Sequence, residues 1–358
     1  MSVDEKYMAR AVQIAWGGLG NVSPNPMVGA VIVCDGRIIG EGYHRRYGGP
    51  HAEVNAIASV AQSDRSLLTR STMYVTLEPC SHFGKTPPCA DLIISTGIPN
   101  VVVGCLDPFE KVSGRGVARL REAGIKVTTG VLEDVCEEQN KVFLTAHRLK
   151  RPFVTLKWAQ SRDGYMARLN AGRPQPVRFS TDASTALVHA MRARHDAIMV
   201  GGSTVMIDTP RLSVREFSGR EPVKIVLDRR GRCNASALQN LAGDTLLYVS
   251  SAEIPAGCAG KSLRVDPKCP LHDVLSLLYS RGITSLLVEV GATLLSSFIE
   301  DGLWDEARVE IAPVNLGTEG AAHVSMPDSA PVECMETGGN IIICVKNEDK
   351  RQWFEQSV

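Results

Sequence analysis

Short apolar runs rich in β-branched residues alternate with helix-like segments along roughly the first 145 residues. The runs at residues 72–79, 100–106 and 126–131 fit buried strands. Residues 29–44 have the pattern of two strands joined by the turn Asp35-Gly36. This alternation predicts βαβ units and a mostly parallel, helix-covered sheet. Helices are expected at residues 7–15, from His51, from Pro88, at residues 116–124 and up to His147.

A basic stretch containing a proline, AHRLKRP, interrupts this pattern and precedes a new strand at residues 153–160. Charge, proline and a restarted pattern are typical of a linker, so we predict a boundary near Leu149 and two domains, 1–148 and 149–358. The last apolar run, residues 340–347, is expected to finish the second sheet. The other strands expected there are at 196–205, 223–229, 244–250, 285–291 and 307–314, and the helices at 184–194, 271–281 and 292–302.

Composition narrows the possible partners and the compartment. The 358 residues include 39 basic and 39 acidic side chains, so the formal charge is zero and a nucleic-acid partner is not expected. Apolar runs stay below the ~18 residues that span a bilayer, and the acidic start does not resemble a signal peptide, which favours a cytoplasmic protein without a membrane partner. The ten cysteines are then expected to be reduced thiols and metal ligands.

Four residues in the first half have the chemistry of a zinc centre. His51 opens a predicted helix with Glu53 in its first turn, while Cys80 follows a strand and Cys89 begins the next helix. A helix N-terminus lowers a thiol pKa and favours the thiolate that binds zinc. One His and two Cys leave a fourth coordination position for water, which the metal acidifies. Glu53 is then the expected proton carrier.

The order of these residues matches the His-x-Glu and Pro-Cys-x-x-Cys signature of zinc nucleobase deaminases, with eight residues instead of two between Cys80 and Cys89. Either half of the signature alone is compatible with chance and with ordinary buried thiols, but together they predict the zinc site. The longer loop contains His82 and Lys85, which we expect to contact substrate. His82 is alternatively a fourth zinc ligand or a plain loop residue.

Five stretches give a more specific resemblance: NPMVGAVIV, GEGYH, GGPHAEVNAI, YVTLEPCSHFGKTPPCADLI and GRGVARLREAGI. They resemble the N-terminal domain of the bifunctional riboflavin-biosynthesis deaminase/reductase family. The resemblance implies a cytidine-deaminase-like three-layer α/β/α domain with one Zn²⁺ per chain on His51, Cys80 and Cys89, and with Glu53 as proton shuttle. It also implies that Asn25 holds the pyrimidine, although Asn25 between two prolines reads equally well as a turn residue.

The second half lacks the GxGxxG dinucleotide fingerprint, but LKWAQSRDG, MRARHDAIMVGGSTVMIDTPRLSVR and LLVEVGATLLSSF resemble the reductase half of that family. This implies a dihydrofolate-reductase-like α/β domain that uses NADPH. By the resemblance, the substrate side is lined by Lys157, Arg192, Leu212, Arg215 and Glu289, and the NADPH side by Ala159, Thr204, Asp208, Gly291, Ala292, Thr293, Leu294, Leu295, Ser296 and Ser297.

Physical chemistry is compatible with several of these roles. Arg192 and Arg215 can grip a phosphate by forked hydrogen bonds, and Gly291 opens a helix whose N–H groups can face a pyrophosphate. Pro176 and Arg178 depart from the family pattern, as does the stretch SRDG, which leaves nucleotide selectivity and local substrate contacts open.

We therefore expect a bifunctional enzyme acting on a pyrimidine ribotide. Its first domain would deaminate 2,5-diamino-6-(5-phosphoribosylamino)pyrimidin-4-one and its second would reduce the ribosyl group to ribityl with NADPH. The resemblance also suggests a homo-oligomer. The alternatives are a zinc nucleobase or tRNA deaminase with an unrelated or inactive C-terminal domain, and a non-catalytic zinc-binding protein in which Glu53 is dispensable.

Overall fold

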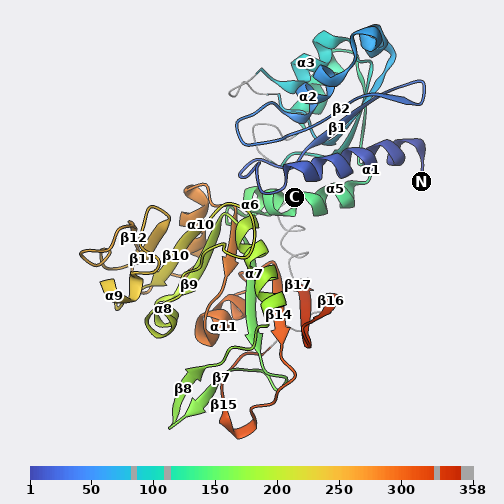
Figure 1. The fold of residues 1–358 in the computed structure, drawn as a ribbon. Coiled ribbons are helices and arrows are strands. Elements are labelled where there is room, and N and C mark those ends of the chain that lie inside the picture. Colours follow the sequence, from blue (N-terminus) through green and yellow to red (C-terminus); the bar gives the residue numbers. More distant parts are fainter. Residues whose placement is uncertain (82–86, 109–113, 326–330, 348–358) are drawn as a thin grey trace. The chain divides into compact units, whose positions relative to one another are not determined.

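The computed structural model describes residues 1–81, 87–108, 114–325 and 331–347. The chain divides into two compact units, Met1–Lys150 and Arg151–Val358, coloured from blue to green and from green to red in Figure 1. No helix in these described ranges is long and apolar enough to cross a membrane.

The first unit is built on a five-stranded sheet in the order β2-β1-β3-β4-β5. Its β1 pairs antiparallel with both neighbours, whereas β3, β4 and β5 are parallel. The antiparallel hairpin turns at Asp35 and Gly36, which both have positive φ, as predicted. The strands are β1 (Gly29–Cys34), β2 (Arg37–Tyr43), β3 (Thr72–Leu77), β4 (Asn100–Cys105) and β5 (Lys126–Thr129).

Helices cover both faces of this sheet because alternate strand residues point to opposite sides. Ile32 belongs to one apolar cluster with residues of α2, α3 and α4, while Val31 belongs to another with residues of α1 and α5. The result is a three-layer α/β/α unit (Figure 1). Its helices are α1 (Val3–Ala15), η1 (Trp16–Gly18), α2 (Ala52–Ser59), η2 (Gln62–Arg70), α3 (Cys89–Thr96), α4 (Arg115–Glu122), α5 (Glu133–Gln139) and α6 (Lys141–Leu149).

The second unit contains a nine-stranded sheet in the order β12-β11-β10-β9-β13-β6-β14-β17-β16. The first seven strands in this order are parallel, and the last two pairings are antiparallel. The strands are β6 (Phe153–Gln160), β9 (Ala197–Gly201), β10 (Val223–Asp228), β11 (Leu246–Ser250), β12 (Lys261–Arg264), β13 (Ser285–Val288), β14 (Glu306–Ile311), β16 (Pro331–Thr337) and β17 (Asn340–Lys346).

Two apolar clusters also flank this larger sheet. One includes buried residues of α10 and α11, and the other includes buried residues of α8 and α9 with Met191 of α7 packed against it. Helices and parallel strands thus bury both faces of the sheet. The helices are α7 (Asp182–Arg194), α8 (Gly202–Asp208), α9 (Ala235–Leu238), α10 (Leu271–Ser280), α11 (Ala292–Glu300) and η3 (Gly317–Glu319).

Two expectations about the second unit were wrong, and one sheet was not predicted. The run at 196–205 is a strand only as far as Gly201, and the helix α8 begins at Gly202. A Cβ added at Gly202 would lie 2.8 Å from Cβ and Cγ of Asp228, so this turn from strand to helix has no room for a side chain. The strand β17 does not finish the sheet, since β16 pairs along its outer side. A separate three-stranded sheet, β15-β7-β8, was also missed. Its strands are β7 (Tyr165–Asn170), β8 (Arg173–Pro176) and β15 (Gly320–His323).

Candidate active sites

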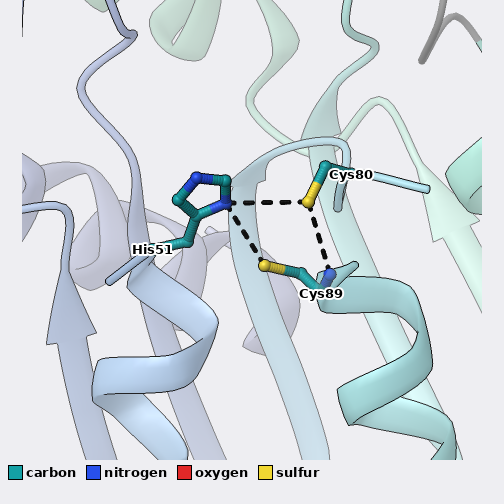
Figure 2. A group of neighbouring side chains, drawn as sticks. All are labelled: His51, Cys80 and Cys89. Atoms are coloured by element: carbon teal, nitrogen blue, oxygen red, sulfur yellow. Dashed lines mark hydrogen bonds between the residues drawn. The ribbon is translucent and has the colours of Figure 1, made fainter. Parts of the chain in front are cut away.

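Three predicted zinc ligands meet at one point in the first unit (Figure 2). His51 is the N-cap of α2, Cys80 follows β3, and Cys89 is the first residue of α3. The Nδ1 atom of His51 lies 3.6 Å from Sγ of Cys80 and 3.3 Å from Sγ of Cys89. A tetrahedral zinc with ordinary Zn–N and Zn–S bonds separates these atoms by ~3.6 Å. The donor set and its spacing therefore fit zinc.

The two thiols are held together by the backbone of α3. The N–H of Cys89 donates to Sγ of Cys80 at 3.3 Å, and the N–H of Ala90 donates to the carbonyl of Cys80 at 3.1 Å. Hydrogen bonding with the side chain of Cys89, followed by that with His51 and with the Cys89 backbone, outweighs burial and lowers the pKa of Cys80 to about 4. Hydrogen bonding to Cys80 and burial raise the pKa of Cys89, so Cys89 is the thiol of the pair that keeps its proton. A bound cation displaces such a proton.

Glu53 lies in the first turn of α2 and is only 3% exposed. Burial raises the pKa of its carboxyl group, and the nearby His51 acts in the opposite direction. Glu53 also lines a cavity of about 290 Å³ together with two of the predicted zinc ligands, His51 and Cys80. The cavity is lined by Pro24, Asn25, Pro26, Val28, His44, His51, Ala52, Glu53, Leu77, Glu78, Cys80, Asp107, Phe143 and His147.

The loop that carries Asn25 is fastened from two sides. Asn140, between α5 and α6, accepts from the N–H of Met27 at 2.8 Å and donates to its carbonyl at 2.9 Å. Nδ2 of Asn25 lies 3.2 Å from Nε2 of His44, whose Nδ1 lies 3.0 Å from the carbonyl of Pro50. Since that carbonyl only accepts, Nδ1 carries the hydrogen and Nε2 accepts from Asn25. With Nδ2 directed to His44, the other polar atom of the Asn25 amide is Oδ1, an acceptor.

Glu78 ties the turn before Cys80 to the start of α4. Its carboxylate accepts from the N–H groups of Gly114 and Gly116 at 2.9 Å and of Val117 at 3.1 Å. An unsatisfied helix N-terminus favours such a carboxylate. Like His44, Phe143 and His147, Glu78 was not among the predicted site residues, although its position beside Pro79-Cys80 was a usable signal.

A second cavity, of about 330 Å³, lies in the second unit at the carboxyl ends of β9 and β10 and the start of α11. It brings together six residues of the predicted cofactor set: Thr204, Gly291, Ala292, Thr293, Leu294 and Ser297. Its remaining walls include Arg229, Arg230 and Arg232, which the sequence interpretation missed. Three arginines directly after a buried strand are a signal that could have been used.

Four other members of that set are absent from the described lining of this cavity. Leu295, on α11, is fully buried in the apolar core, and Ala159 packs against the small cluster around Phe179. Asp208, at the end of α8, and Ser296 also lie outside the lining.

The predicted substrate residues of the second unit form a linked group. Arg192 of α7 holds Glu289 with a fork of two hydrogen bonds, each 2.9 Å long, and donates to the carbonyl of Ser213 at 3.2 Å. Its fork is thus committed to a carboxylate, whereas Arg215 donates to Oγ of Ser213 and is exposed. Burial acts to raise the pKa of Glu289, but Arg192 and then Lys157, on β6, outweigh it electrostatically and lower the pKa.

Of the other positions that the sequence singled out, the structure describes three and does not describe two. Leu212 is buried with a positive φ of 53°. Pro176 ends β8, and Arg178 pairs with the exposed Asp182 at 2.7 Å. His82 and Lys85 lie outside the described residues.

The fold and the two sites define a zinc-binding deaminase domain followed by a reductase domain. Residues 1–105 match the model of the cytidine and deoxycytidylate deaminase zinc-binding region, and residues 152–337 match that of the RibD C-terminal domain. The chain belongs to the RibD family of riboflavin biosynthesis proteins. It is therefore a bifunctional deaminase and reductase of riboflavin biosynthesis that uses zinc and NADPH, and the predicted cytidine-deaminase-like and dihydrofolate-reductase-like folds are confirmed.

Relatives from distant bacteria cover both domains. The chain is 39% identical to riboflavin biosynthesis protein RibD of Aquifex aeolicus, over 88% of each chain, and 36% identical to that of Escherichia coli, over 90% and 91%. The solved RibD of Acinetobacter baumannii has a TM-score of 0.85 at 33% identity, covering 96% of this chain and 98% of that one. A deaminase/reductase from Thermotoga maritima has a TM-score of 0.81 at 35% identity, with the same coverage. An unrelated C-terminal domain is thus not favoured.

Proposed function

We propose that the deaminase domain converts 2,5-diamino-6-(5-phosphoribosylamino)pyrimidin-4-one to 5-amino-6-(5-phosphoribosylamino)uracil, and that the reductase domain then reduces the ribosyl chain to ribityl. The Thermotoga maritima relative is named as a diaminohydroxyphosphoribosylaminopyrimidine deaminase and 5-amino-6-(5-phosphoribosylamino)uracil reductase, which supports both steps. The observation that carries the proposal is the meeting of His51, Cys80 and Cys89 beside a cavity that buried Glu53 lines together with His51 and Cys80.

In the deaminase domain, His51, Cys80 and Cys89 hold zinc, which when bound supplies a water acidified toward neutrality as the nucleophile. Glu53 takes a proton at its carboxylate and returns it to the leaving amine, since it lies against the same cavity. Asn25 orients the pyrimidine through Oδ1. His82 and Lys85 stay predicted substrate contacts.

In the reductase domain, the second cavity binds NADPH, which supplies the hydride. The start of α11 at Gly291–Ala292 offers backbone N–H groups to the phosphates, and Arg229, Arg230 and Arg232 add positive charge along the same wall. Thr204, Thr293, Leu294 and Ser297 complete the lining, while Ala159, Asp208, Leu295 and Ser296 belong to the proposed site only through the family resemblance.

On the substrate side, Arg215 grips the phosphate of the pyrimidine ribotide, and Lys157, Glu289 and Leu212 surround the sugar. Arg192 acts by holding Glu289 and the backbone at Ser213. We propose domain limits of 1–148 and 149–358, which agree closely with the compact units Met1–Lys150 and Arg151–Val358.

The test is a coupled assay of the whole protein on the diaminopyrimidine ribotide, following ammonia release and NADPH oxidation together. Glu53→Gln keeps the shape of the side chain and removes its proton transfer. We expect it to lose ammonia release, to retain zinc, and to reduce the pre-deaminated substrate like the wild type. Full ammonia release by Glu53→Gln would contradict the role of Glu53, and no release by the wild type with zinc present would contradict the substrate.

We also propose that the protein works in the cytoplasm as a homo-oligomer. All ten cysteines lie in the described part of the chain and are free, as expected in a reducing compartment. The oligomer is an expectation from the family resemblance, and light scattering of the purified protein tests it.

A further inference from the structure

His189 of α7 is a buried histidine that the proposed chemistry does not use. His189 is only 1% exposed and lies on the same helix as Arg192, one turn before it. Its Nδ1 atom accepts two backbone hydrogen bonds, from the N–H of Arg215 at 2.9 Å and from the N–H of Glu216 at 2.7 Å. Both partners are donors, so Nδ1 carries no hydrogen and the ring is neutral, with its proton on Nε2.

These two amides belong to the segment 212–216, which follows α8 and contains two predicted substrate residues. The segment begins at Leu212, whose φ of 53° is unfavourable for a leucine and needs support from its surroundings. Arg192 donates to the carbonyl of Ser213, and Glu221 accepts from the N–H of Val214 at 2.9 Å.

Two side chains of α7 therefore hold the segment on both sides of Arg215. Residues three apart on a helix share a face, which is how His189 and Arg192 reach the same segment. His189 fixes the amides of Arg215 and Glu216, while Arg192 fixes the carbonyl of Ser213 and is itself held by Glu289. The guanidinium of Arg215 extends from this fixed backbone and is exposed.

We propose that His189 is a positioning residue for the reductase reaction: by accepting from the amides of Arg215 and Glu216, it sets the backbone from which Arg215 reaches the substrate phosphate. This inference rests on the proposed role of Arg215. A mispositioned arginine loses the geometry of its charged hydrogen bonds, so the cost falls on binding of the phosphorylated substrate and not on hydride transfer.

The tautomer makes this support sensitive to acid. A proton on Nδ1 would face two N–H donors and remove both hydrogen bonds. Burial, followed by the charges of Arg192 on α7 and Arg215 on the segment, lowers the pKa of His189, while Glu216 and Glu289 act in the opposite direction. The neutral, supporting form thus persists below the ordinary histidine value of about 6.5 and is lost as the pH falls further.

The matched variants are His189→Leu and His189→Asn in the whole protein. Leucine fills a similar space without an acceptor, whereas Oδ1 of asparagine is bonded to Cγ as Nδ1 is and can accept from the same amides. With 5-amino-6-(5-phosphoribosylamino)uracil and NADPH, His189→Leu should raise the KM for the pyrimidine about tenfold, as expected for loss of a charged hydrogen bond, with kcat and the KM for NADPH little changed. His189→Asn should stay near wild type.

Two further measurements separate positioning from a general loss of structure. On the substrate lacking its 5′-phosphate, wild type and His189→Leu should have the same KM, and ammonia release by the deaminase domain should be unchanged. Between neutral and acidic pH, the KM of the wild type should rise more than that of His189→Asn. The substrate phosphate titrates in the same way in both assays, so the difference between the two KM profiles does not contain its contribution.

Arg215→Gln separates a failure of the positioning role of His189 from a failure of the proposed phosphate contact of Arg215. If Arg215→Gln raises the KM and His189→Leu does not, the positioning role is wrong while the proposed function stands. If Arg215→Gln has no effect, the proposed phosphate contact is wrong and the inference falls with it. An equal effect of His189→Leu with and without the phosphate, or identical pH profiles of wild type and His189→Asn, would also overturn it.

Discussion

Asn25 donates from Nδ2 to Nε2 of His44 across 3.2 Å, and this one contact decides which end of the amide a ligand in the deaminase cavity meets. His44 can accept because its Nδ1 hydrogen is directed to the carbonyl of Pro50. Burial lowers the pKa of His44, which favours the neutral ring that this arrangement needs. In the proposed reaction, Oδ1 of Asn25 is therefore the atom that accepts from the pyrimidine.

Asn25→Asp tests this orientation with little change in shape. A carboxylate cannot donate to Nε2 of His44 and brings a negative charge to the cavity wall. We expect the KM for deamination to rise about tenfold or more, since a buried polar group loses its partner. Steady-state ammonia release measures it, and Asn21→Asp, at an exposed asparagine of the preceding turn, is the control. An unchanged KM in Asn25→Asp would contradict the assigned amide orientation.

The amount of zinc bound per chain should depend on Cys89 and not on an exposed cysteine elsewhere. Cys89→Ser removes one of the three proposed ligands, whose atoms lie within 4.8 Å of one another. We expect less than one zinc per chain after dialysis, together with loss of ammonia release, while NADPH oxidation with pre-deaminated substrate continues. Metal analysis provides the measurement. Cys334→Ser, at an exposed cysteine of β16, should retain full zinc, and equal zinc in both variants would exclude Cys89 as a ligand.

The zinc centre could be predicted because its residues carry strong local signals. His51 caps a helix, Cys89 begins one and Cys80 follows a strand, so patterns within short windows predicted the placement of the three residues that the structure brings together. The contact between Asn25 and His44 could not be predicted, since it joins side chains from separate segments and depends on which ring nitrogen carries the hydrogen.

In the second domain the sequence predicted the central strands better than the edges. The strand at 153–160 is long, apolar and bounded as predicted, because it is buried between neighbours on both sides. The strands β7 and β8 are mostly exposed, with partly buried residues only in the first half of β7, so they show no alternating pattern of apolar and polar residues. Arg192 was predicted to grip phosphate, but its fork holds Glu289, a pairing across 97 residues that no local pattern reveals.

The arginines that line the second cavity should determine the preference for NADPH. Arg230 and Arg232 lie on the turn after β10, where neither is needed for the core. The double variant Arg230→Gln/Arg232→Gln should raise the KM for NADPH about tenfold, because charged hydrogen bonds to the 2′-phosphate are lost, and leave that for NADH unchanged. Arg173→Gln, on exposed β8, is the matched control. Equal changes for both cofactors would contradict a role in reading the 2′-phosphate.

Asp305 should stabilise the reductase domain far more than an exposed aspartate does. Its carboxylate accepts from Nη1 of buried Arg151 at 2.7 Å and from the N–H of Val154 at 2.6 Å, at the start of β6. Asp305→Asn leaves the buried guanidinium without a counter-charge, which costs about 3 kcal/mol or more of unfolding free energy. Asp182→Asn breaks the exposed pair with Arg178 and should cost less than about 1 kcal/mol.

Urea unfolding followed by loss of NADPH oxidation and by tryptophan fluorescence measures both variants. Trp158 and Trp304 are buried in the core of the reductase domain, so their emission reports on this domain. The midpoint for Asp305→Asn should fall well below that of the wild type, while Asp182→Asn stays close to it. Similar midpoints for the two variants would mean that a neutral amide satisfies Arg151 as well as the carboxylate does. The stability of the first strand of this domain would then depend on hydrogen bonding and not on charge.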